Sequence, residues 1–159
     1  MRKLAAMTVI VFVLFSGTAF ADSNVGGKGR FGLGLAIGDP TGLTAKYMLN
    51  RKTGISTTVE WKTSGETEIN ASFDVLFHTY GVVEIRGTVS PVYVGAGLRL
   101  KHHDREGRDD EFAIRVPIGI ECLFTKLPVG AFAELVPTLD VKPDTEIGIQ
   151  LSVGIRYYF

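Results

Sequence analysis

The feature that most constrains the fold is a strict alternation at the end of the sequence, over residues 146–159. One set of alternate positions is apolar or aromatic throughout: Ile147, Ile149, Leu151, Val153, Ile155, Tyr157 and Phe159. The positions between them are polar or small, apart from the aromatic Tyr158: Glu146, Gly148, Gln150, Ser152, Gly154, Arg156 and Tyr158. Successive side chains of a β-strand point to opposite faces, so this segment predicts a strand with one apolar face. Either a second sheet or lipid must cover that face.

The same alternation occurs earlier in the chain, in segments separated by turn residues. Seven further strands are predicted at 30–38, 43–49, 55–63, 68–78, 92–101, 112–124 and 129–139. Pro40 and Gly42 predict a tight turn after the first of them. Residues 79–91 are long for a hairpin connection, and Val82–Arg86 could extend a strand or form a small one. The pattern therefore predicts an all-β chain of eight antiparallel strands.

Charged residues avoid the apolar face of all these segments. The opposite face carries six basic residues and five acidic ones: Lys46, Lys62, Arg99, Lys101, Arg115, Arg156, Glu60, Asp74, Glu121, Glu134 and Glu146. An Arg or Lys on the lipid face of a barrel costs about 2–4 kcal/mol at the bilayer midplane, so a membrane barrel should show this segregation. A soluble β-sandwich would also segregate its charges, and alternation alone does not decide between them.

The aromatic residues lie near strand ends, which favours a membrane. With an even number of strands, both termini are on one side, which we expect to be periplasmic. Two girdles are then predicted on the apolar face, the expected place for amphipathic rings at membrane interfaces. The periplasmic girdle is Phe31, Tyr47, Phe77, Phe124, Tyr157 and Phe159, and the outer one is Trp61 and Phe112. An open sheet edge in lipid would leave backbone groups unpaired, so the strands should close into an up-and-down transmembrane β-barrel.

The N-terminus has the pattern of an export signal. Arg2 and Lys3 precede an apolar run from Met7 to Phe15, and small residues precede Asp22. We expect a cleavable signal peptide at 1–21, a flexible lead-in at 22–29 and a barrel domain at 30–159. A retained membrane helix is the alternative, but the apolar run is shorter than the roughly 20 residues that a spanning helix needs.

The remaining composition excludes some classes of partner. Removing 21 of 159 residues leaves 138, with 15 Lys and Arg against 17 Asp and Glu and a net charge of −2. That balance predicts no nucleic-acid partner. The single Cys122 cannot form an internal disulfide and is expected to face lipid as a small apolar residue.

A C-terminal strand with alternate apolar residues and a terminal Phe159 resembles the assembly signal of bacterial outer-membrane barrels, carried here by Tyr157 and Phe159. The chain as a whole resembles the small eight-stranded barrels of the OmpA/OmpX transmembrane-domain type. Residues 38–46 and 154–159 are also similar to a group of bacterial barrel proteins of uncharacterised function. The resemblance implies a bacterial outer-membrane location, contact with outer-membrane lipid and with the barrel-assembly machinery during insertion, and a monomer. The short outer loops depart from that pattern.

The interior charges define the candidate site. We expect a lumen charge network of Lys46, Glu60, Lys62, Asp74, Arg99, Arg115, Glu121, Glu134 and Arg156. Buried charges persist only when they are paired, so Arg99, Arg115 and Arg156 are predicted to pair with Glu60, Glu121 and Glu134. The near balance of charge indicates a filled lumen with a structural or interaction role. A narrow small-solute channel and a soluble lipocalin-like binding barrel remain alternatives.

Catalytic, metal and cofactor sites are not predicted. Ser72, Asp74 and His78 share the interior face of one strand, and some lipid-A-modifying barrels are enzymes. Ser72 and His78 are nevertheless six residues apart, roughly 20 Å along a strand, so they cannot hydrogen-bond to each other. His102, His103 and Asp104 could meet a metal, but adjacent side chains at a strand end diverge, which favours a solvated loop.

Overall fold

The structure is a computed structural model of the chain, and it describes residues 29–39, 41–62, 68–103, 111–142 and 145–159. Within these ranges it describes only the backbone of Trp61, Lys62, Glu68, Ile69, His102, His103 and Lys142. The predicted signal peptide lies outside the described residues, as does the lead-in apart from Gly29. None of the described segments forms a helix long and apolar enough to cross a membrane.

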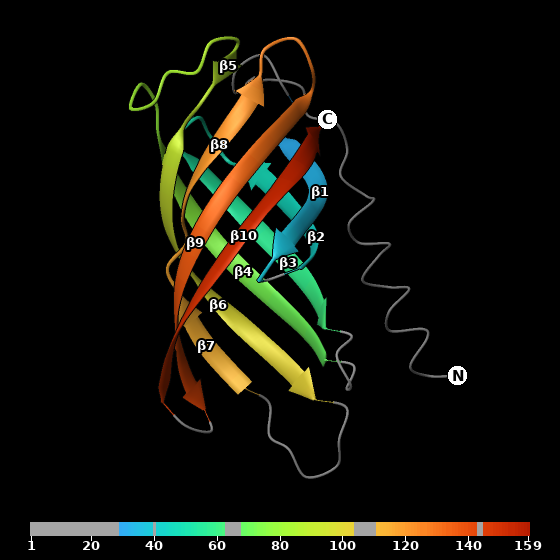
Figure 1. Ribbon diagram of the computed structural model, residues 1–159, viewed down its shortest axis with the longest axis vertical. Coiled ribbons are helices and arrows are strands. Elements are labelled where there is room, and N and C mark those ends of the chain that lie inside the picture. Colours follow the sequence, from blue (N-terminus) through green and yellow to red (C-terminus); the bar gives the residue numbers. More distant parts are fainter. Residues whose placement is uncertain (1–28, 40, 63–67, 104–110, 143–144) are drawn as a thin grey trace, which may run out of the picture.

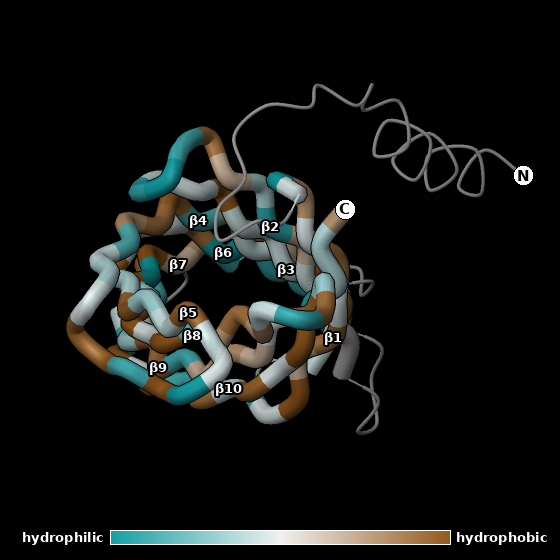
Figure 2. Tube along the Cα trace, turned by 90° about the horizontal axis from the view of Figure 1, so that it is seen from above, coloured by the Kyte–Doolittle hydropathy of each residue, from teal (hydrophilic) through white to brown (hydrophobic). Residues whose placement is uncertain are grey.

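The described chain is built from antiparallel strands that coil around one axis (Figures 1 and 2). The strands are β1 Phe31–Gly38, β2 Gly42–Met48, β3 Thr53–Lys62, β4 Glu68–Thr79, β5 Thr88–Val89, β6 Val92–His103, β7 Glu111–Arg115, β8 Ile118–Phe124, β9 Val129–Lys142 and β10 Glu146–Tyr158.

The sheet closes on itself because the first and last strands pair. β1 pairs with β10 from Gly32 opposite Tyr158 to Gly38 opposite Ser152, and β10 pairs with β9 on its other side. β7 and β8 form one wall strand that is interrupted at Val116 and Pro117, since both pair with β6 and with β9. Proline has no N–H to donate to the ladder, which accounts for the interruption. The prediction of a closed, eight-stranded antiparallel barrel is confirmed, and β5 is a short addition at one rim.

The strand boundaries differ from the prediction in places. β3 begins at Thr53, within the turn expected at 50–54, and β9 continues to Lys142 instead of ending at 139. No strand forms at Val82–Arg86; the small strand in this connection is β5, which pairs with Leu123 and Phe124 of β8.

The polarity of the barrel is the reverse of that of a soluble protein. The large apolar side chains of β10 point outward, and Ile147 and Ile149 are 79% and 70% exposed. Charged side chains point inward, and Lys46, Arg115 and Glu121 are each 1% exposed. The interior is therefore the charged part of the molecule, and a continuous apolar surface surrounds it.

Candidate functional site: the charged lumen

The candidate site is the set of ionised side chains that the strands direct into the lumen. Each belongs to the polar half of an alternating strand, so the pleat turns it inward while its neighbours point outward. The structure buries eight of the nine residues of the predicted network: Lys46, Glu60, Asp74, Arg99, Arg115, Glu121, Glu134 and Arg156. The ninth, Lys62, has no described side chain.

Glu121 of β8 is the centre of a first cluster. Lys46 Nζ on β2 lies 2.5 Å from Glu121 Oε2, and Arg156 Nη1 on β10 lies 3.3 Å from Oε1. The Tyr158 hydroxyl also donates a hydrogen bond to Oε1. β2 and β8 are on opposite walls of the barrel, so the Lys46–Glu121 pair spans the lumen. Two cations and a phenol therefore compensate one buried carboxylate.

Arg156 has further partners, one at the edge of its guanidinium group and one over its face. Its Nη2 donates to Thr44 Oγ1 at 3.0 Å, and its Cζ lies 3.8 Å from the centroid of the Phe132 ring. A guanidinium over an aromatic face is attracted by the ring quadrupole, and this contact is worth most where water is excluded. The first cluster has two cations and one carboxylate, and these contacts stabilise the cation of Arg156.

Arg115 of β7 is the centre of a second cluster, which has the opposite balance. Its guanidinium lies 3.1 Å from Asp74 on β4, 3.4 Å from Glu134 on β9 and 3.7 Å from Glu60 on β3. Tyr93 on β6 donates a 2.8 Å hydrogen bond to Glu134 Oε2. One guanidinium thus joins side chains from three other strands, and its removal would leave three carboxylates close together.

The predicted pairing is right for two arginines and wrong for the third. Arg115 and Arg156 pair with acids of the predicted set, but Arg99 Nη2 pairs with Asp140 Oδ1 at 2.8 Å. Asp140 was outside the prediction because β9 was expected to end before it. Asp140 continues the regular register of β9 opposite Ala113, and Ala113 in turn pairs with Arg99 on β6.

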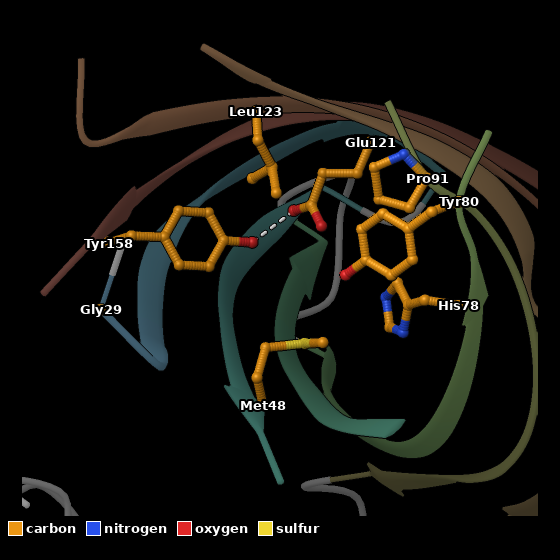
Figure 3. Close-up of a pocket in the computed structure, with 8 residues that line it drawn as sticks. All are labelled: Gly29, Met48, His78, Tyr80, Pro91, Glu121, Leu123 and Tyr158. Carbon is orange, nitrogen blue, oxygen red and sulfur yellow. Dashed lines mark hydrogen bonds between the residues drawn. The ribbon is translucent and has the colours of Figure 1, made fainter. Parts of the chain in front are cut away.

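An apolar cluster lies inside the rim that holds both Phe31 and Phe159, which we call the terminal rim. Met48, Leu123 and Tyr158 form an apolar cluster there, and Tyr80 and Val89 of the long connection pack against it. Figure 3 shows the small cavity that remains below, with the Tyr80 hydroxyl and the His78 ring turned into it. Its free volume is about 10 Å³, enough for about one water molecule. Burial raises the pKa of the Tyr80 phenol, so the group stays protonated.

The candidate catalytic residues have separate partners. Ser72 donates to the Thr58 carbonyl oxygen at 3.4 Å, and Asp74 pairs with Arg115. His78 Nδ1 lies 3.3 Å from the Lys52 carbonyl oxygen. Ser72 and His78 thus have separate partners, as their six-residue spacing along the strand predicted. The side chains of His102, His103 and Asp104 lie outside the described part, within which no group of three His, Cys, Asp or Glu could hold a metal ion.

The predicted girdle residues whose side chains the structure describes lie on the outer surface near strand ends. Phe31, Tyr157 and Phe159 meet at the terminal rim, with ring centroids 6.2 Å apart for Phe31 and Phe159 and 4.9 Å for Tyr157 and Phe159. The rings on the neighbouring strand ends are exposed: Tyr47, Phe77 and Phe124. Phe112 is half-buried near the opposite rim, and the Trp61 side chain is not described.

Sequence reasoning placed three aromatic residues on the interior face but missed what they pack against. Tyr158 is paired with Gly32, Tyr93 with Gly119 and Phe132 with Gly154, on neighbouring strands. A Cβ at these three glycines would lie 2.5–2.7 Å from the aromatic ring or its hydroxyl. The glycines therefore make room for rings as well as for charged chains. Only the cross-strand register reveals this, and the sequence does not contain the register.

Comparison with solved structures identifies a similar fold. The crystal structure of the N-terminal β-barrel domain of Pseudomonas aeruginosa OprF superposes with a TM-score of 0.61 and 16% sequence identity, covering 83% of this chain and 99% of that one. No protein-family model matches the chain, and no curated protein matches it significantly. The chain therefore has the closed eight-stranded barrel fold of the OprF N-terminal domain.

Proposed function

We propose that the protein is a monomeric outer-membrane β-barrel of the bacterial cell envelope with a structural or interaction role, exported by a cleaved signal peptide and inserted by the barrel-assembly machinery. The inverted polarity carries this proposal. Exposed aliphatic side chains surround the barrel, while ionised side chains are buried inside it. Water would penalise this outer surface, whereas lipid would not. The terminal rim, with its aromatic side chains, lies at the periplasmic interface.

The same observation argues against a soluble lipocalin-like barrel. Such a protein needs an apolar interior for its ligand and a polar exterior for water. Here Lys46, Arg115 and Glu121 occupy the interior, and the cavity at the terminal rim holds about one water molecule.

The test of the membrane assignment is cell fractionation combined with gel mobility. The protein should remain with the outer membrane until detergent is added, and boiling should change its electrophoretic mobility. Release into the soluble fraction without detergent would exclude this function. A Leu151→Ser, Val153→Ser variant is a useful comparison, because its polar outer face should reduce insertion without touching the lumen.

A narrow channel is the second candidate. The ionised lumen favours it, but the Lys46–Glu121 contact spans the barrel, and Tyr80 and Val89 pack against an apolar cluster at the terminal rim. We therefore expect no steady conductance of the purified protein in a planar bilayer. A stable single-channel current that is altered by Lys46→Met would support the channel instead.

A further inference from the structure

The connection 80–87 and the turn 125–128 form one exposed patch at the terminal rim. They are joined by Thr125, whose N–H donates to the Gly87 carbonyl oxygen at 3.1 Å, and by the β5–β8 ladder. In Figure 1 the yellow-green connection after β4 bends out to the left of the barrel wall. The patch consists of Val82, Ile85, Arg86, Lys126 and Leu127, all of them exposed. We call it the rim patch.

The rim patch combines apolar and cationic side chains. Val82 and Leu127 are 61% and 58% exposed, although neither belongs to the apolar surface of the strands. In the chain, Arg86 follows Ile85 and Lys126 precedes Leu127, and Glu84 is the one exposed acid of this connection. Aliphatic side chains next to Lys and Arg are typical of segments that lie in the headgroup region of a membrane, where the apolar groups enter the lipid and the cations meet phosphates.

Charge is distributed unevenly between the two ends of the barrel. The three connections at the terminal rim, 49–52, 80–91 and 125–128, carry four basic residues and one acidic residue. In the sequence, the segments that link the other ends of the strands, 39–41, 63–67, 104–110 and 143–145, contain two basic and seven acidic residues. A partner with negative charge would therefore be attracted to the terminal rim and repelled by the opposite one.

We propose that the rim patch binds anionic glycerophospholipids of the membrane leaflet next to the terminal rim. Val82, Ile85 and Leu127 enter the acyl-chain boundary, and Arg86 and Lys126 bind the headgroup phosphate. The rim patch is continuous with the exposed strand surface through Phe124, which directly precedes the turn and pairs with Thr88. The inference rests on the proposed membrane location and extends it by assigning a lipid class to one segment. It also gives the unusually long connection a role.

The test uses lipid-borne quenchers and a single label. In a Cys122→Ser background, a fluorescent label is attached to Val82→Cys or to Leu151→Cys, and the full barrel is refolded in phosphatidylcholine vesicles that contain a minority of phosphatidylglycerol. A nitroxide quencher is placed on the acyl chain of one lipid or the other. At position 82, quenching per molecule should be at least about fivefold stronger for phosphatidylglycerol, which corresponds to one Lys or Arg at an anionic surface.

The label at position 151 separates the two proposals, because that position lies on the strand surface. Quenching at 151 with none at 82 would overturn the lipid patch and leave the membrane assignment standing. An absence of quenching at both positions would overturn the membrane assignment itself. Equal quenching of position 82 by both lipids would overturn the headgroup selectivity.

Charge variants complete the test. Arg86→Gln with Lys126→Gln should abolish the preference for phosphatidylglycerol at position 82, whereas Arg86→Lys should keep it. Glu84→Gln should strengthen the preference, since it removes the one exposed acid of the connection. A preference that survives the double Gln substitution would show that Arg86 and Lys126 do not select the lipid. None of these side chains enters the lumen, so each variant should fold. Gel mobility verifies this.

Discussion

Lys46 and Glu121 join opposite walls of the barrel, with Nζ 2.5 Å from Oε2 and a separation of 75 positions in the chain. Both side chains are almost fully buried, so water could not solvate the charge of one residue if the other were removed. The fold therefore depends on an ion pair at a point where a soluble protein would have an apolar core. A buried pair of this kind need not be the most stable arrangement, but removing one partner leaves an uncompensated charge.

The Lys46–Glu121 pair predicts a large cost for a single substitution. Lys46→Met should lower the free energy of unfolding in vesicles by about 3–5 kcal/mol, measured by urea titration. Lys101→Met is the matched control: Lys101 pairs with Glu111 near the opposite rim, where both side chains are 23% exposed, so the loss should be at most about 1 kcal/mol. Similar losses in the two variants would show that the lumen pair is as well solvated as a rim pair.

Combining Lys46→Met with Glu121→Gln tests whether the two residues act together. The double variant should lose clearly less stability than the sum of the single variants, because each single variant breaks the same Lys46–Glu121 contact. The coupling free energy should be about 1–3 kcal/mol. Strict additivity would mean that Arg156 and Tyr158 alone determine the environment of Glu121.

Glu134→Gln tests the second cluster. Glu134 accepts a hydrogen bond from Tyr93 and lies 3.4 Å from Arg115 Nη2. Loss of the charge should reduce stability by about 1–3 kcal/mol in a thermal or urea melt. Tyr93→Phe, which removes only the phenolic donor, should cost less. An unchanged melt of Glu134→Gln would be hard to reconcile with a paired role.

Features of the barrel that depend on neighbouring residues in the chain could be predicted from the sequence. Features that depend on pairing between distant strands could not. Which face a residue such as Arg115 or Leu151 occupies follows from the two-residue period of a strand, and the sequence predicted it. The closed barrel followed because an open edge is costly in lipid. Arg99 pairs with Asp140 because β9 is longer than expected and the ladder aligns Asp140 with Ala113 and Arg99, and neither feature leaves a pattern in the sequence.

The lumen aromatics show the same limit. Tyr93, Phe132 and Tyr158 each lie between two outward-facing residues of their strands, so the two-residue period predicts that they point inward. Their roles depend on the glycines that face them across the ladder. Such a pair joins residues that are distant in the chain, and one sequence without the register cannot identify it.

A charge placed on the outer surface should be costly according to its depth. Leu151→Arg, near the middle of β10, should lower stability in vesicles by about 2–4 kcal/mol, and Ile147→Arg, near the opposite rim, by about 0–1 kcal/mol. Urea titration of both variants in the same vesicles measures the difference. Equal effects would indicate that position 147 lies as deep in the lipid as position 151, or that neither is in lipid.

The most direct test of the central claim is a spin-label scan along residues 147–157 of β10 in vesicles, in a Cys122→Ser background. The account predicts that oxygen, which concentrates in lipid, relaxes labels at odd positions such as 151, 153 and 155 strongly, and labels at even positions weakly. It also predicts little access of a water-soluble nickel complex to the odd positions. Odd positions shielded from oxygen like a packed protein core, or an absence of alternation, would contradict it.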